Sequence, residues 1–280
     1  MPQGNRDSPC LMVYYEICYE VRASVTGWQA FFYIECIWQS SLFLSHVLDL
    51  LLTLKRNGHR TRLTTEFCRD IAWWLRFLRT YSGVSIISSF IWTAPDTVFS
   101  TDACLLGCGS LSQSQYFHIQ FPPEVLARFL EIHLLEALAI LVALRLWGHL
   151  WAGCRIQVFC DNAAVLSALT SGKVKDQSLA ALLCDIWYLA ASHDFELRTV
   201  HLPGKENRAA DLPARWHLDS NFGARFWQLP VCASLSSVSV PHDFFTVYDY
   251  YRIYPRIGGT FFKEKNVQNS GAAYTLVQEF

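Results

Sequence analysis

The fold is decided by Val98-Phe99-Ser100-Thr101-Asp102-Ala103 and by the chain that follows it as far as Asp211. Four acidic residues stand in this stretch, each flanked by apolar or small residues. They are Asp102 in VFSTDA (98–103), Glu136 in LLEAL (134–138), Asp161 in VFCDN (158–162) and Asp211 in NRAAD (207–211). Each is expected where a helix or strand meets the core, and an unpaired carboxylate there is costly. Four such residues indicate a bound cation.

The residues around these acids predict alternating strands and helices. Strands are expected over 98–103, 116–121, 155–160 and 195–202, with Gly107-Cys108-Gly109 allowing a tight reversal. Helices are expected over 132–150, 162–169 and 178–191, followed by a final helix that Asn207 caps. The order β-β-β-α-β-α-α-β-α predicts an α/β fold with a mixed five-stranded sheet flanked by helices.

Two of the acids have a predicted place relative to the sheet. Glu136 shares a helix face with Ala139, Ala143 and Trp147, and small residues on that face permit close approach to a sheet. Asp161 follows a strand at its C-terminal end, where ligand sites of α/β proteins gather. Taken alone, any one of these acids is more often a cap or a surface group, and Asp161 is then the cap of the helix that follows it.

The flanking segments are less regular and suggest four parts of the chain. Segment 1–41 is apolar and poorly specified, and segment 42–94 is helical, with Thr64 capping a helix whose apolar stripe includes Trp74. Ala94-Pro95-Asp96 is a turn and marks the expected boundary of a domain over 95–218. Segment 219–280 is read as a poorly specified tail or a strand-forming appendage.

The composition indicates how large a core the chain can bury and which binding partners its charge favours. With 52% hydrophobic residues in 280, the chain can bury a sizeable core, and its net charge of −1 gives no sign of a polyanionic partner. Seven basic residues against two acidic ones lie between Lys55 and Thr80, either as a solvated helix face or as phosphate contacts.

The cysteines and the apolar segments indicate the cellular compartment in which the protein is expected. The ten cysteines have no regular spacing, and the pair Cys104 and Cys108 lacks a second Cys/His pair at zinc spacing. Without a signal pattern at the N-terminus, we expect an intracellular protein, in the cytoplasm or nucleus, that is not secreted. Polar residues interrupt the apolar segment 28–54, which favours a buried helical segment over a membrane span.

The four carboxylates suggest a chemistry of phosphodiester cleavage. Two divalent cations about 3.5–4 Å apart activate a water and stabilise the leaving oxygen, and they need several carboxylates converging on one point. Ligands that offer only oxygen suit magnesium or manganese. The order of strand Asp, helix Glu, strand-end Asp and final-helix Asp is far more specific than any one of these acids.

These residues resemble the ribonuclease H domain of reverse transcriptases, most closely that of DIRS-type (tyrosine-recombinase) retrotransposons. The resemblance is carried by STDA (100–103) with Gly107-x-Gly109, LEALA (135–139), Asp161-Asn162, and VHLPGKEN (200–207) leading to Ala210-Asp211. Upstream, LTTEF (63–67) and DIAWW (70–74) look like the segment that joins polymerase to nuclease in that family. The resemblance extends over about 42–216.

The resemblance implies a ribonuclease H-like fold with a helical N-terminal segment, and a metal-dependent endonuclease that cuts the RNA strand of an RNA–DNA hybrid. The metal ligands are then Asp102, Glu136, Asp161 and Asp211, with two magnesium or manganese ions. It also implies that His201 helps the product leave, and it makes Asn162 and Asn207 substrate-contacting or capping residues. The hybrid would be recognised by groove shape and 2′-hydroxyls.

Two departures from the family pattern keep other functions open. No Asp-Asp pair occurs in the chain, so polymerase activity is expected to be absent. Pro213 follows Asp211 by two residues, and proline there is expected to bend or end the helix of the fourth ligand and weaken the second metal. The alternatives are a catalytically inactive fold remnant or nucleic-acid-binding module, and an integrase-like enzyme, whose last acid is normally a glutamate.

Overall fold

The computed structural model describes residues 46, 49–50, 64–77, 94–172 and 174–247. The chain divides into two compact units, one of residues 1–80 with 249–280 and one of residues 81–248, and each is described by itself. Segment 1–41, most of the helix expected from residue 42 onward and the tail beyond residue 247 lie outside the described residues.

In the first unit, helix α4 (Thr65–Phe77) begins where the sequence predicts. Thr64 Oγ1 accepts a hydrogen bond from the backbone N–H of Phe67 at 3.2 Å, which caps the helix. Trp74 is 4% exposed and is therefore a core residue, as its place in the apolar stripe indicates. Arg69 belongs to the basic segment, yet it is 8% exposed and pairs with Asp70 at 3.3 Å.

The second unit is built on a mixed sheet in the order β5-β4-β1-β2-β3-β6. The strands are β1 (Thr97–Ala103), β2 (Gly107–Ser112), β3 (Gln115–Gln120), β4 (Arg155–Cys160), β5 (Glu196–His201) and β6 (Ser236–Ser237). β1, β2 and β3 form an antiparallel meander, whereas β4 runs parallel to β1 and β5 parallel to β4. The four predicted strand ranges correspond to β1, β3, β4 and β5, while β2 lies where a reversal was expected and the short β6 adds a sixth strand beside β3.

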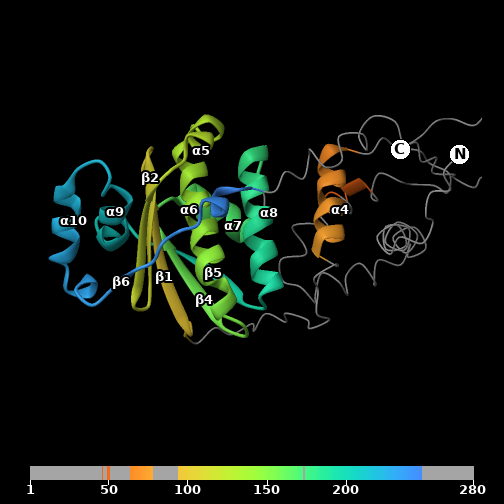
Figure 1. The fold of residues 1–280 in the computed structure, drawn as a ribbon. Coiled ribbons are helices and arrows are strands. Elements are labelled where there is room, and N and C mark those ends of the chain that lie inside the picture. The colour runs from red at the N-terminus through yellow and green to blue at the C-terminus, as the bar shows by residue number, and fades with distance from the viewer. Residues whose placement is uncertain (1–45, 47–48, 51–63, 78–93, 173, 248–280) are drawn as a thin grey trace, which may run out of the picture. The chain divides into compact units, whose positions relative to one another are not determined.

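Helices cover both faces of this sheet (Figure 1). They are α5 (Pro123–Arg128), α6 (Ile132–Trp147), α7 (Ala163–Ser171), α8 (Gln177–Ser192), α9 (Arg208–Ala214) and α10 (Ser220–Trp227). α6 packs on β1 and on α8, while α9 packs on β1, β2 and β3 from the opposite side. The strand order, strand directions and helix layers make up the ribonuclease H-like fold that the sequence predicts.

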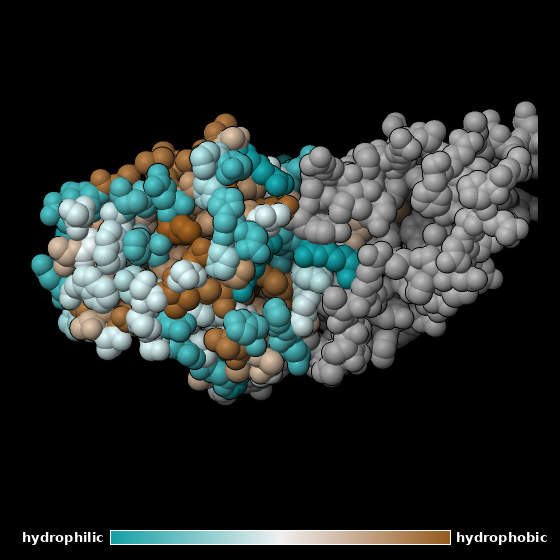
Figure 2. Space-filling view, viewed as in Figure 1, coloured by the Kyte–Doolittle hydropathy of each residue, from teal (hydrophilic) through white to brown (hydrophobic). Residues whose placement is uncertain are grey.

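Helix α6 is the centre of the core. Twelve of its residues are buried, Glu136 among them, and the run Ala137–Leu144 is fully buried. Together with the 3-10 turn Gly148–Leu150 it is long and apolar enough to cross a membrane, but 72% of its apolar window is buried inside the protein. Its composition is therefore explained by contact with the sheet and α8. On the face of the unit shown in Figure 2, polar and apolar residues are intermixed.

The prediction of a chain reversal at Gly107-Cys108-Gly109 is wrong. The chain turns at Leu105 and Leu106 instead, where the backbone N–H of Cys104 donates to the Gly107 carbonyl at 2.9 Å, and both glycines lie in β2. A Cβ on Gly109 would lie 2.6 Å from the backbone nitrogen of Ala214. Glycine is therefore required here because α9 approaches the strand closely, and no turn needs it.

Residues 219–247, expected to be part of a poorly specified tail, are ordered in the second unit. α10 packs on α9, and Phe226 and Cys232, both 0% exposed, join a small core with Tyr116 and Leu212. Arg145 on α6 donates to the Phe244 carbonyl at 2.6 Å and so secures the end of the segment. The apolar residues responsible are spaced irregularly along short elements, which is why no period reveals them.

Candidate metal centre

The second unit brings the four predicted acids together from four elements. Asp102 is on β1, Glu136 on the first turns of α6, Asp161 directly after β4, and Asp211 on α9. The carboxyl groups of Asp102 and Asp211 are within hydrogen-bonding contact, and so are those of Glu136 and Asp161. The charge of Asp161 also acts on Asp102, which links the two pairs. The structure therefore forms one cluster of four carboxyl groups.

Asp102 lies at the centre of this cluster. Its side chain is buried at 5% exposure, and burial together with the neighbouring acids raises the pKa of its carboxyl to about 9. Burial is the largest cause, followed by the charges of Asp161, Asp211 and Glu136 in that order. A carboxyl so placed holds its proton at neutral pH unless a cation takes the proton's place.

The pKa of the Glu136 carboxyl is also raised, and two hydrogen-bond donors reduce this increase. Burial raises the pKa of its carboxyl to about 7, and the neighbouring Asp161 charge acts in the same direction. The Cys160 thiol donates to Glu136 Oε2 at 3.1 Å, and the Asn162 side chain also hydrogen-bonds the carboxylate, so both lower the pKa. Glu136 is thus held in one orientation, with its charge only partly compensated.

Asp161 offers an oxygen atom that has no hydrogen-bond partner. Its Oδ1 is buried and unpartnered among the described residues, a costly state for a carboxylate oxygen. On the other side, a Cβ on Gly204 would lie 2.9 Å from Asp161 Oδ2, so the loop after β5 closes against this carboxylate. His201, at the end of β5, places Nε2 3.0 Å from the Asp161 backbone carbonyl.

Asp211 is more accessible than Asp102 and Glu136. Its side chain is 30% exposed and forms an ion pair with Arg215, one turn further along the chain. That pair provides a positive charge at the open edge of the cluster, where solvent screens it. Among the described residues, Asp102, Glu136 and Asp161 form no ion pair with a cationic side chain.

A divalent cation fits this cluster on three observations. Two pairs of carboxyl groups interact and raise the pKa of Asp102 and of Glu136, the Asp161 Oδ1 atom is unpartnered among the described residues, and ligand atoms of Glu136, Cys160 and Asp161 lie within 4.8 Å of one another. Carboxylate oxygens are the ligands that magnesium and manganese prefer. The cluster can therefore hold ions through Asp102, Glu136, Asp161 and Asp211.

The two predicted asparagines have different roles. Asn162 caps α7, since its Oδ1 accepts from the backbone N–H groups of Ala164 and Val165 at 3.0 and 3.2 Å. Asn207 makes no side-chain capping bond and is 1% exposed, so it is too deeply buried to contact a substrate. Its amide instead donates to the Thr101 carbonyl at 3.0 Å. Asn162 is confirmed as a cap, whereas Asn207 connects α9 to β1.

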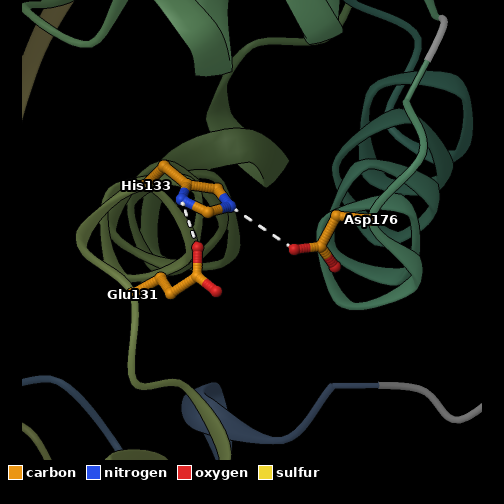
Figure 3. A group of neighbouring side chains, drawn as sticks. All are labelled: Glu131, His133 and Asp176. Carbon is orange, nitrogen blue, oxygen red and sulfur yellow. Dashed lines mark ion pairs between the residues drawn. The ribbon is translucent and has the colours of Figure 1, made fainter.

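A second group of titratable side chains lies at the N-terminal ends of α6 and α8 (Figure 3). The His133 ring lies between two carboxylates, with Nδ1 3.4 Å from Glu131 and Nε2 3.5 Å from Asp176. Asp176 also caps α8, accepting from the backbone N–H groups of Ser178 and Leu179. The group is partly exposed, and it joins the N-terminal ends of α6 and α8, so it has a structural explanation.

Known structures share the fold at low similarity. One is ribonuclease H1 from the halophilic archaeon Halobacterium salinarum NRC-1, with 18% identity over 44% of this chain and 98% of that chain, at a TM-score of 0.36. Another is the N-terminal ribonuclease H domain of Rv2228c from Mycobacterium tuberculosis, studied as a fusion with maltose-binding protein. Its identity is 19% over 41% of this chain and 92% of that chain, at a TM-score of 0.30.

Sequence comparison adds no assignment. No protein-family model matches the chain, and no curated protein matches it. At these identities and TM-scores the structural similarities assign no activity, so any function has to be argued from the carboxylate cluster itself.

Sequence reasoning missed two residues of the site. The Cys160 thiol donates a hydrogen bond to Glu136, and the backbone carbonyl of Thr101 accepts a hydrogen bond from the Asn207 side-chain amide. A signal for Cys160 was present, because it occupies the last strand position before Asp161 and so faces the helix layer with Ile156 and Val158. The backbone carbonyl of Thr101 has no sequence signal.

Proposed function

We propose that this chain is a metal-dependent endonuclease that cleaves the RNA strand of RNA–DNA hybrids. The observation that carries the proposal is the convergence of Asp102, Glu136, Asp161 and Asp211 from four elements into one cluster. A purely structural role does not explain it, because carboxylate repulsion and burial at Asp102 and Glu136 destabilise the fold unless a cation offsets them.

The four carboxylates would hold two magnesium or manganese ions. Ions bound there supply an activated water and stabilise the leaving oxygen of a phosphodiester. The chain's own contribution is to fix the ligands. The Cys160 thiol and the Asn162 amide orient Glu136, the Gly204 loop limits the movement of Asp161, and the Asn207 amide holds α9 against β1.

The proposed role of His201 is consistent with its position. It is exposed and lies at the end of β5, adjacent in register to Cys160 and within contact of the Asp161 backbone. An exposed imidazole here is accessible to a phosphodiester bound at the cluster. We therefore retain it as a residue that assists product release.

We further propose that the chain derives from the reverse transcriptase of a DIRS-type retrotransposon. The motifs from Ser100 to Asp211 support this origin, and the missing Asp-Asp pair supports the lack of polymerase activity. Segment 42–94 would then correspond to the connection between polymerase and nuclease.

One observation favours the alternative of an inactive nucleic-acid-binding remnant. Arg215 forms an ion pair with Asp211, the fourth proposed ligand. If that pair persists in the presence of magnesium, the cluster has only three carboxylates for its ions. The two functions therefore differ in whether metal displaces Arg215 from Asp211.

A cleavage experiment separates the two. The full chain is incubated with magnesium or manganese and a hybrid labelled on the RNA strand, beside duplex DNA and single-stranded RNA. We expect cleavage of the hybrid RNA only, and none with Asp161→Asn. Hybrid binding without cleavage in either metal would establish the binding module instead.

A further inference from the structure

The carboxylate cluster contains a thiol. Cys160 is 0% exposed, and its Sγ lies 3.1 Å from Glu136 Oε2. Because β4 ends at Cys160 and Asp161 follows at once, the two residues present a sulfur and a carboxylate to the same space beneath α6. In the magnesium site described above this thiol only donates a hydrogen bond to Glu136, and no magnesium ligand there is a sulfur atom.

The three side chains satisfy the distances needed to share one ion. Ligand atoms of Glu136, Cys160 and Asp161 all lie within 4.8 Å of one another. In a tetrahedral zinc site the metal is about 2.3 Å from sulfur and about 2.0–2.2 Å from oxygen, so neighbouring donor atoms are about 3.5 Å apart. The observed separation of 3.1 Å between sulfur and Oε2 is close to this value.

The donor set also selects the kind of ion. Magnesium binds oxygen and gains nothing from Cys160, whereas zinc binds both thiolate and carboxylate. The unpartnered Asp161 Oδ1 is available as the third donor. We propose that Glu136, Cys160 and Asp161 form a binding site for a thiophilic divalent cation, with zinc as the ion of the matching class.

Binding at this site involves proton release and no oxidation. As the metal–sulfur bond forms, the thiol proton of Cys160 passes to solvent and the Cys160–Glu136 hydrogen bond is lost. Glu136 Oε2 is then free to bind the same ion. Since Glu136 and Asp161 are also proposed magnesium ligands, zinc would compete with magnesium, a consequence that rests on the proposed function.

The experiment uses cobalt(II) as a spectroscopic substitute for zinc and needs no nucleic acid. The full chain is titrated with cobalt(II) without thiol reductants, and the near-ultraviolet band of cobalt–thiolate charge transfer is recorded. Zinc affinity is measured by competition with a chromophoric chelator. We expect the band with the unmodified chain, its displacement by zinc, and at least a tenfold loss of zinc affinity in Cys160→Ser.

Two further variants make the result decisive. Glu136→Gln keeps the thiol but removes one donor, so it should also weaken zinc binding, even if Cys160→Ser fails to fold. Cys154→Ser removes a partly exposed thiol away from the cluster and should change neither the band nor the affinity. A band and affinity unchanged in both Cys160→Ser and Glu136→Gln would overturn the proposal, whatever the outcome of the cleavage experiment.

Discussion

The side-chain amide of Asn207 donates a hydrogen bond of 3.0 Å to the backbone carbonyl of Thr101. This single bond joins the start of α9, which carries Asp211, to the strand position just before Asp102. Asn207 is 1% exposed, so water does not replace the bond when it is lost. Together with the packing of α9 on the sheet, Asn207 therefore fixes how Asp102 and Asp211 face each other.

Replacing Asn207 by Ala should loosen α9 and weaken metal binding together. Loss of a buried hydrogen bond costs about 1–3 kcal/mol, and the magnesium affinity should fall because Asp211 is no longer held against Asp102. Urea unfolding and calorimetric magnesium titration measure the two effects. Asn221→Ala, on the exposed part of α10, is the matched control and should alter neither. Unchanged magnesium affinity in Asn207→Ala would reduce Asn207 to a stability role.

Asp102→Asn should stabilise the metal-free protein and abolish cleavage. In this variant the charges of Asp161, Asp211 and Glu136 no longer repel a buried carboxylate. Each unit by which that repulsion raises the pKa of Asp102 corresponds to about 1.36 kcal/mol of free energy. We expect a higher melting temperature without magnesium and a smaller rise when magnesium is added. A large loss of stability would instead indicate that Asp102 is a structural residue.

The stability of the metal-free protein should fall as the pH rises. In the unfolded chain, Asp102 and Glu136 lose their protons near their ordinary pKa values of 3.8 and 4.5, whereas in the folded chain burial raises these to about 9 and about 7. The folded state therefore binds more protons between about pH 4 and 9, and raising the pH favours unfolding. Urea midpoints at several pH values test this, and saturating magnesium should flatten the slope. A slope unaffected by Asp102→Asn would exclude Asp102 as its source.

Most of the second unit was predictable because its elements carry strong local patterns. The apolar helix over 132–150 and the strand before Asp161 each follow a single pattern of apolar residues. Acidic residues near the ends of these two elements indicate where the helix and the strand meet. Gly109 was not predictable in this way, since a glycine in a strand and a glycine in a turn look alike in sequence. Glycine is needed at position 109 because the backbone of Ala214, which is distant in the sequence, lies close to it.

The site was predictable only in part, for a similar reason. Asp102, Glu136, Asp161 and Asp211 stand out because a carboxylate among apolar residues is unusual. Asn207 resembles a helix cap by its position, but its bond to Thr101 is a contact between distant segments. Contacts of this kind depend on packing, which a single sequence does not display.

Gly109→Ala should move α9 and so disturb Asp211. The added Cβ would lie 2.6 Å from the Ala214 backbone nitrogen, and overpacking of this kind costs about 1–3 kcal/mol. We expect lower stability and weaker magnesium binding. Gly204→Ala is the matched comparison, because its Cβ would meet only the end of the Asp161 side chain. That variant should lose magnesium affinity with little loss of stability, and equal stability losses in the two would contradict the packing argument.

Pro213 is expected to leave the fourth ligand undisturbed, contrary to what its position in the sequence suggests. α9 ends at Ala214, one residue after the proline, so little helix remains to be distorted. The Asp211 N–H still donates to the Asn207 carbonyl at 3.0 Å, and the Asp211 carbonyl accepts from the Arg215 N–H at 3.2 Å. The backbone of Asp211 is thus held on both sides.

Pro213→Ser should therefore leave the magnesium dependence of cleavage unchanged within about twofold while lowering the free energy of unfolding by about 1 kcal/mol. The stability loss is expected because Pro213 is buried against Gly109, where a Cβ on the glycine would lie 2.8 Å from the proline Cβ. Pro230→Ser, at the exposed start of a 3-10 turn, controls for the loss of proline itself. If Pro213→Ser lowers the magnesium concentration for half-maximal rate, the proline does strain Asp211, and the backbone bonds on either side are not enough to hold it.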